Sequence, residues 1–302
     1  MSKNVNRRSA LKNMALGTSA VGFGLAGLSF REPKADTLEL EKDKISSDLN
    51  GNINHSACYW CYNSIPLEKF APDAAKLGLV AIDLLRPEEW EVVEQYGLKC
   101  AVATDTFASI TDGFNDPANH AKLQEQYTKL ISQAAAKDIP NVICFSGSRR
   151  ELSQEEGLNN CVTGLKPLVA QAEKEGVVLI MELLNSKVNH PDYQCDHTEW
   201  GVALCDRLDS DHFKLLYDIY HMQIMDGDII ATIREYHPYF AHYHTGGVPG
   251  RNEINQSQEL NYPAIMQAIV DTGFKGYVAQ EFVPTYTDKI AALKEGVGIC
   301  DV

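Results

Sequence analysis

Residues 215–221 have the sequence Leu-Leu-Tyr-Asp-Ile-Tyr-His, in which an apolar run leads directly into Asp218. A continuous apolar run of this kind is typical of a strand that is buried on both faces in a parallel sheet. His221 follows three residues after the carboxylate. The stretch therefore predicts a central parallel strand that ends in a side chain of the metal-ligand type.

Three other strand-like runs end in a similar way: residues 177–181 lead into Glu182, 240–243 into His244, and 277–280 into Glu281. In parallel α/β folds, the carboxyl ends of the strands lie on one side, and functional sites form there. We therefore expect Glu182, Asp218, His244 and Glu281 to converge on one site, with the remaining chain as its scaffold.

Strand and helix patterns alternate along residues 53–302. The expected strands are 53–60, 79–85, 98–103, 141–145, 177–182, 213–218, 240–244 and 277–281. The expected helices are 66–77, 87–96, 118–137, 153–175, 198–208, 226–236, 263–272 and 288–294. Eight strand–helix units in about 250 residues predict a single-domain (β/α)8 TIM barrel. Long polar loops at 104–119 and 183–196 are typical of lids or binding loops.

Composition narrows the functional class. The chain has 302 residues, of which 44% are hydrophobic, so it can bury a full core. Its formal net charge of −14 argues against a nucleic-acid partner, because phosphate binding needs clustered Lys and Arg. A small anionic substrate is still compatible, since one Arg and a metal ion can dominate the field inside a pocket.

The first 35 residues have the pattern of a targeting segment. Arg7 and Arg8 precede an uncharged stretch, 13–30, that is rich in Gly, Ala and Ser. This pattern resembles a twin-arginine export signal, and the alternative is a membrane anchor. We interpret 1–35 as a signal segment and 36–52 as a linker. The expectation is an exported, periplasmic protein with no stable membrane span after processing.

Eight cysteines in an exported chain raise the question of disulfides. Cys58-Tyr-Trp-Cys61 has the spacing of a redox motif. No thioredoxin-like pattern surrounds it, so we interpret both residues as ordinary strand and loop cysteines. No second pair has zinc-ribbon spacing.

Three carboxylates and one imidazole form a mixed oxygen and nitrogen ligand set, which suits a divalent Mn, Mg, Co or Zn ion. Glu182 and Glu281 come from strands separated by two others, so they can face each other across the ion. This arrangement suits proton transfer between neighbouring carbons: one Glu removes a proton and the other returns it. Glu182 and Glu281 are therefore the expected catalytic residues.

Other polar residues near the strand ends are candidates for substrate binding. His221 is placed to contact a substrate oxygen, and the glycine-rich loop 246–250 can deliver Arg251 over the pocket to bind a carboxylate. His242 shares a strand face with His244 but lies deeper, so we interpret it as a hydrogen-bonded core residue. Arg149 and Arg150 are weaker candidates.

The chain from residue 177 onward resembles the hydroxypyruvate isomerase family of the xylose isomerase-like barrels. The resemblance rests on the segments 215–228, 247–251 and 259–265. It implies a divalent metal held by Glu182, Asp218, His244 and Glu281, and acid and base roles for the two glutamates. Related ketose 3-epimerases imply substrate contacts at His221 and Arg251.

The first functional hypothesis is therefore a metal-dependent isomerase acting on hydroxypyruvate or a related hydroxy-carbonyl or sugar substrate. The second is a sugar epimerase or dehydratase on the same barrel, because the same acid–base pair serves those reactions. The third is a non-enzymatic periplasmic sugar-binding protein. A fourth possibility, a zinc nuclease with the same barrel, conflicts with the acidic net charge of the chain. The sequence leaves open the metal, the substrate, and whether copies of the chain form a homo-oligomer.

Overall fold

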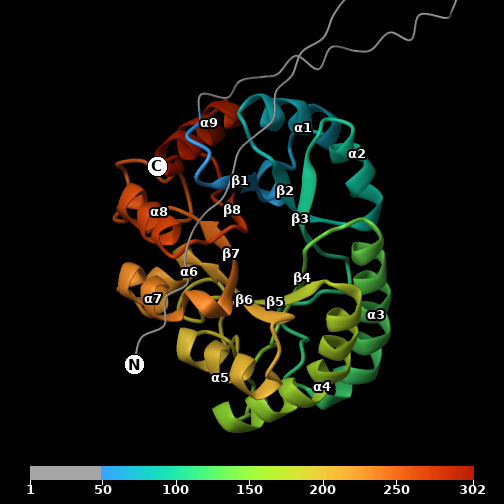
Figure 1. The fold of residues 1–302 in the computed structure, drawn as a ribbon. Coiled ribbons are helices and arrows are strands. Elements are labelled where there is room, and N and C mark those ends of the chain that lie inside the picture. Colours follow the sequence, from blue (N-terminus) through green and yellow to red (C-terminus); the bar gives the residue numbers. More distant parts are fainter. Residues whose placement is uncertain (1–48) are drawn as a thin grey trace, which may run out of the picture. The chain divides into compact units, whose positions relative to one another are not determined.

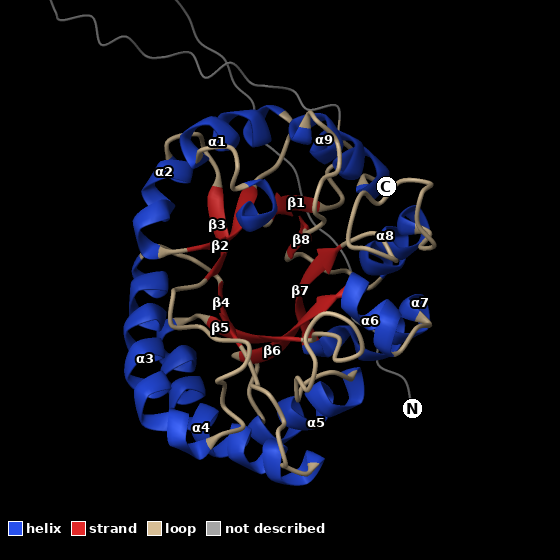
Figure 2. Ribbon diagram, turned by 180° about the vertical axis from the view of Figure 1, so that it is seen from behind, coloured by secondary structure: helices blue, strands red, loops and turns tan. Residues whose placement is uncertain are grey.

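The computed structural model describes residues 49–302. The expected signal segment, 1–35, and most of the expected linker, 36–52, lie outside this range. Figure 1 shows a ring of strands surrounded by helices, and Figure 2 shows the same ring from behind. Each strand in the sheet pairs in parallel with its neighbours. The predicted TIM barrel is therefore confirmed.

The strands of the barrel are β1 (Asn54–Ala57), β2 (Ala81–Leu85), β3 (Lys99–Ala103), β4 (Asn141–Cys144), β5 (Val178–Glu182), β6 (Phe213–Asp218), β7 (Phe240–Thr245) and β8 (Tyr277–Gln280). The helices are α1 (Leu67–Lys76), α2 (Trp90–Glu94), α3 (His120–Ala136), α4 (Gln154–Glu175), α5 (Thr198–Leu208), α6 (Ile219–Met225), α7 (Ile229–Tyr236), α8 (Tyr262–Asp271) and α9 (Lys289–Cys300). Short 3-10 helices are η1 (Tyr59–Tyr62), η2 (Pro87–Glu89), η3 (Pro117–Asn119) and η4 (His237–Tyr239).

The strand order in the sheet is β1-β8-β7-β6-β5-β4-β3-β2. The barrel therefore closes where the first and last strands of this order, β1 and β2, meet, and we call this junction the seam. One parallel bridge between Cys58 and Asp83 spans this seam, and the Val80 amide donates to the His55 carbonyl 2.9 Å away. Strand β2 is irregular at this point. Its register to β3 shifts on both sides of Asp83, and Leu84 has a left-handed φ of 60°. A bulge of this kind changes the direction in which a strand side chain points.

The core follows from the apolar runs. Every residue of β4 is buried, and the apolar residues of β6 are buried as well, as expected for strands covered on both faces. Helix α4 begins with a capping box between Ser153 and Glu156 and is capped at its carboxyl end by Gly176, where φ is 76°. None of the helices between residues 49 and 302 has the length and apolar character needed to cross a lipid bilayer.

Several sequence expectations about element bounds were wrong, and the last helix, expected over 288–294, continues to Cys300. The first strand, expected over 53–60, ends at Ala57, because the chain turns into η1 and carries Trp60 away from the sheet. The segment after β6 was expected to stay irregular until residue 226. Instead, the Asp218 side chain accepts from the His221 amide and caps helix α6, which begins at Ile219.

Candidate functional site

The four predicted ligands lie together at the carboxyl end of the barrel. Glu182 and Asp218 are the last residues of β5 and β6, His244 lies near the end of β7, and Glu281 directly follows β8. One ligand atom from each of the four lies within 4.8 Å of the others, and all four residues are buried. The strand topology thus brings together side chains that are far apart in the sequence.

Contacts within this group centre on the imidazole of His244. Its Nδ1 lies 2.8 Å from Glu281 Oε2 and 3.3 Å from Glu182 Oε1. Among the described residues, Glu182 Oε1 has no hydrogen-bond partner. The indole Nε1 of Trp60 donates to Glu281 Oε1 over 2.7 Å. His244 therefore directs one ring nitrogen toward the carboxylates, and Glu182 directs an unpaired oxygen into the same space.

Burial and mutual repulsion control the ionisation of the carboxylates. Burial and the Glu281 charge raise the pKa of Glu182. Burial also raises the pKa of Asp218 well above its usual value. Although burial opposes it, the Arg251 guanidinium and the His244 imidazole hold the pKa of Glu281 well below its usual range. Three buried carboxyl groups thus lie close together, and the neighbouring basic groups, Arg251 and His244, do not offset the burial of all three.

The residues of this cluster fit a divalent cation. Three buried carboxylates with one imidazole are a mixed donor set for such an ion, and the closely spaced ligand atoms include an unpaired buried oxygen. Buried charges are retained in proteins when they are paired or when they coordinate a metal. Glu182, Asp218, His244 and Glu281 would hold the ion.

Arg251 reaches this cluster from the loop after β7. Its Nη2 lies 2.5 Å from Glu281 Oε2 and 3.3 Å from Asp218 Oδ2. The guanidinium carbon stands 5.1 Å from the ring centroid of Trp60 and 5.4 Å from that of Tyr220, within range of cation–π attraction. The predicted placement of Arg251 over the site is therefore found, and two aromatic rings orient its side chain.

The loop that carries Arg251 depends on a close backbone approach. A Cβ at Gly247 would lie 2.3 Å from the carbonyl oxygen of Glu253, which no side chain can tolerate. The Gly247 amide donates to the Asn252 carbonyl, and Arg251 has a left-handed φ of 58°. Glycine at position 247 thus allows the tight turn that directs Arg251 inward.

His221 is fully buried beside the cluster, with Nε2 3.7 Å from Asp218 Oδ2. The backbone amide of Asn185 donates to its Nδ1 over 3.1 Å, and the Asn185 side-chain nitrogen lies 2.6 Å from the same atom. Because Nδ1 accepts, the ring proton of neutral His221 is on Nε2. Within residues 49–302 this Nε2 has no hydrogen-bond partner. Burial and Arg251 lower the pKa of His221 well below its usual value.

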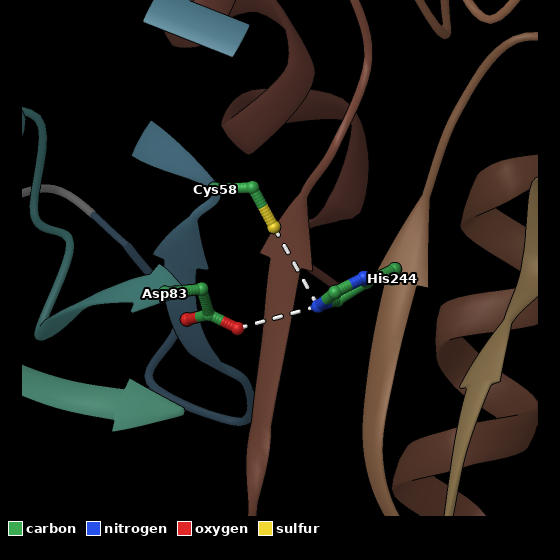
Figure 3. A group of neighbouring side chains, drawn as sticks. All are labelled: Cys58, Asp83 and His244. Atoms are coloured by element: carbon green, nitrogen blue, oxygen red, sulfur yellow. Dashed lines mark hydrogen bonds and ion pairs between the residues drawn. The ribbon is translucent and has the colours of Figure 1, made fainter. Parts of the chain in front are cut away.

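Two residues that sequence reasoning did not select contact the far side of His244. Asp83 Oδ2 lies 3.4 Å from His244 Nε2, and Cys58 Sγ lies 3.5 Å from the same nitrogen, as Figure 3 shows. Asp83 Oδ2 also lies 2.5 Å from His242 Nε2, so His242 is a buried core residue in close contact with an acidic group. A charged residue inside the apolar run of β2 was the available signal for Asp83.

Charge and burial have opposite effects on these two residues. Burial alone would raise the pKa of Asp83, but His242 and His244 lower it below the usual range. Burial and the Glu281 charge raise the pKa of the Cys58 thiol well above its usual value. Asp83 is therefore an ionised acceptor, whereas Cys58 is a neutral thiol.

The remaining candidates lie elsewhere. Arg150 pairs with Asp112 and Asp116, and Arg149 pairs with Asp192, in exposed loops. In the described part of the chain, neither arginine forms an ion pair with the four candidate ligands. All eight cysteines are free and buried, so Cys58 and Cys61 form no disulfide in this structure. The interpretation of Cys58 as an ordinary strand or loop cysteine was incomplete, because its thiol contacts His244.

Comparison with known proteins places residues 72–299, more than half of the chain, within the family described as xylose isomerase-like TIM barrel. The "Putative hydroxypyruvate isomerase" of Homo sapiens is 28% identical over 173 residues, which cover 56% of this chain and 62% of that protein. The chain thus matches less than two thirds of that relative's length. The 2-oxo-tetronate isomerase of Haemophilus influenzae is 25% identical over 235 residues, covering 74% of this chain and 90% of that protein.

Solved structures share the fold. An AP endonuclease, family 2, from Brucella melitensis superposes with a TM-score of 0.72 at 22% identity, covering 81% of this chain and 97% of that one. A D-psicose 3-epimerase from Clostridium cellulolyticum H10 gives 0.66 at 19% identity, covering 83% of this chain and 100% of that one. At these identities the likeness concerns the barrel alone, because one fold hosts many activities.

Proposed function

The chain belongs to the xylose isomerase-like TIM barrel family, and from this premise we propose that it is a metal-dependent isomerase of small hydroxy-carbonyl acids. The first candidate reaction is the interconversion of hydroxypyruvate and tartronate semialdehyde. The observation that carries the proposal is the convergence of Glu182, Asp218, His244 and Glu281, whose ligand atoms lie within 4.8 Å of one another. The names of the human and Haemophilus influenzae relatives support the same reaction class.

The reaction is a proton transfer between neighbouring carbons. A proton leaves C3 of hydroxypyruvate, a proton joins C2, and the hydroxyl proton passes from O3 to O2, so no oxidant or reductant is consumed. When bound, a divalent ion would polarise the substrate oxygens and stabilise negative charge that develops on them. Glu182 and Glu281 supply the acid–base pair: one carboxylate removes the proton and the other returns one.

Two further side chains would bind and orient the substrate. Arg251 supplies a fixed cation for the carboxylate of the acid, a role that suits the planar fork of a guanidinium. The unpaired Nε2–H of His221 would donate to a substrate oxygen, since it is buried and has no partner among the described residues. The rings of Trp60 and Tyr220 lie beside the Arg251 guanidinium and would help to hold it in position.

A substrate panel tests this proposal. The purified protein is loaded with Mn²⁺ or Mg²⁺ and incubated in deuterated water with hydroxypyruvate, a 2-oxo-tetronate and several free ketoses. We expect isomer formation from an acid, with solvent deuterium incorporated at carbon. Glu182→Gln and Glu281→Gln should each lower turnover by about 10²–10⁴-fold, the usual contribution of a general acid or base. Glu155→Gln, an exposed carboxylate on α4, is the matched control.

The outcomes separate the alternatives. Turnover of free ketoses but of no acid would replace the isomerase proposal with a sugar epimerase. Binding of a sugar without turnover or deuterium exchange would support a non-enzymatic binding protein. Turnover that survives Glu281→Gln unchanged would remove the proposed acid–base role.

Export to the periplasm is a second proposal, which rests on Arg7, Arg8 and the uncharged stretch that follows them. Cell fractionation of the full-length chain tests it. Replacing both arginines by lysine should leave the protein in the cytoplasm, and an unchanged distribution would contradict a twin-arginine signal.

A further inference from the structure

Both ring nitrogens of His244 face acidic groups, but on opposite sides. Nδ1 faces Glu182 and Glu281, as expected for a ligand to the ion. Nε2 faces Asp83 Oδ2 at 3.4 Å and Cys58 Sγ at 3.5 Å. Figure 3 shows Cys58, directly after β1, and Asp83, in β2, both directed at this nitrogen, with β8 lying between β1 and β7. The ring is therefore held between the candidate metal centre and a second buried group.

Asp83 is an unusual residue for its position. It is fully buried in the short apolar strand β2, where a carboxylate without a partner would be costly. The strand bulges at this residue, and Leu84 next to it has a φ of 60°, a conformation that is strained for leucine. Strained backbone and bulges occur often beside functional sites, where they direct a side chain. Here the bulge accompanies a carboxylate that points at two histidines.

We propose that Asp83 is a positioning residue that fixes the orientation and tautomer of His244, so that His244 Nδ1 binds the metal. A neutral imidazole that binds metal through Nδ1 carries its proton on Nε2, and Asp83 Oδ2 is the nearby acceptor for that proton. Metal-binding histidines usually donate their second nitrogen to such a partner. His242, 2.5 Å from the same oxygen, holds Asp83 in place. This inference rests on the metal centre of the proposed function.

The same atoms also suggest a different arrangement, in which Cys58, Asp83 and His244 would hold an ion of their own. Two observations argue against it. His244 would have to bind ions through both nitrogens at once. Asp83 Oδ2 also lies only 2.5 Å from His242 Nε2, so this oxygen is already in contact with a second histidine. A positioning role needs no rearrangement of these contacts.

Metal affinity of the intact protein provides the first test. Asp83→Asn keeps the size of the side chain but removes its negative charge, so the amide oxygen is a weaker acceptor for the two histidines that face it. Asp226→Asn is the matched control, because Asp226 also contacts a histidine, His197, away from the cluster. We expect Asp83→Asn to weaken Mn²⁺ binding, measured by titration calorimetry, by about 10–100-fold, the usual loss when such a partner is removed. The absorption spectrum of the Co²⁺-loaded protein should change as well, because it reports ligand geometry.

Outcomes of this test separate the two proposals. If the wild type binds metal and the folded Asp83→Asn variant binds it with equal affinity and an unchanged Co²⁺ spectrum, the role of Asp83 is refuted while the metal centre stands. If the wild type binds no divalent ion, both proposals fail. If the wild type binds two ions and Asp83→Asn binds one, Asp83 is itself a ligand and the positioning role is refuted.

A second measurement does not depend on a variant that folds. Nitrogen NMR of wild-type protein containing ¹⁵N-labelled histidine, recorded with and without Zn²⁺, identifies His244 as a histidine whose signals respond to the ion. The proposal expects this ring to bind zinc through Nδ1 and to keep a slowly exchanging proton on Nε2. Binding through Nε2, or an Nε2 without a proton, would overturn it.

Discussion

Arg251 Nη2 lies 2.5 Å from Glu281 Oε2, so the loop after β7 and the end of β8 are joined at the centre of the site. This contact places a fixed positive charge beside a candidate catalytic carboxylate. In the proposed function, the same guanidinium would also bind the acid group of the substrate.

Replacing Arg251 by lysine should weaken recognition of an acid substrate. Lysine keeps the charge but loses the planar fork that matches a carboxylate. A charge-assisted hydrogen bond contributes about 1.5–3 kcal/mol, so kcat/KM should fall by about 10–100-fold, mainly through KM. Steady-state kinetics on the best acid of the panel measures this. Arg150→Lys, in an exposed loop, should behave as the wild type, and equal kinetics for both variants would contradict the role of Arg251.

Removing divalent metal should lower the thermal stability of the folded chain. Without an ion, Glu182, Asp218 and Glu281 remain buried together, and their basic neighbours among residues 49–302 are Arg251, His244 and His221. A ligand at 100 times its dissociation constant adds about 2.7 kcal/mol to the free energy of unfolding. For a domain of this size, that corresponds to an increase in Tm of about 5–10 °C. Calorimetry with EDTA and then with excess Mn²⁺ measures the difference, and an unchanged Tm would count against the metal centre.

Asn185→Asp should disturb the tautomer of His221. The carboxylate can still accept from the amides of Val188 and Asn189, as the asparagine oxygen does. The backbone amide of residue 185 still donates to His221 Nδ1, but the side chain now places a carboxylate oxygen beside this nitrogen, which should draw the histidine proton from Nε2 toward Nδ1. We expect kcat/KM to fall about tenfold or more, the cost of one hydrogen bond. Histidine NMR would show the change of tautomer, and Asn159→Asp on α4 is the control; an unchanged spectrum would contradict the assignment.

Acid should destabilise the protein partly through His55. Burial lowers the pKa of His55, which Asp301 only partly offsets. As the pH falls below about 6.5, the unfolded chain takes up a proton at this residue before the folded chain does. The free energy of unfolding therefore decreases with falling pH until the folded pKa is passed. Urea unfolding at several pH values should show a shallower decrease for His55→Gln, and parallel curves would disprove the contribution.

The sequence was sufficient to identify the four candidate ligands because parallel strands fix where their ends meet. Glu182 and Asp218 needed only the recognition of an apolar run and its last residue. Asp83 could not be found in this way, because its contact with His244 depends on closure of the barrel between β1 and β2 and on a local bulge. The cap that Asp218 provides for α6 was also missed, because this carboxylate had already been interpreted as a metal ligand at the end of a strand.

Trp60 donates its indole proton to Glu281 and stacks against Arg251, and its side chain is 40% exposed at the rim of the site. The other tryptophans, Trp90 and Trp200, donate instead to backbone carbonyls of Leu85 and Gln154. Any ion or substrate that moves Glu281 or Arg251 must change the surroundings of the Trp60 indole. The intrinsic fluorescence of the chain thus offers a direct optical signal of occupancy, readable without a dye or a coupled assay.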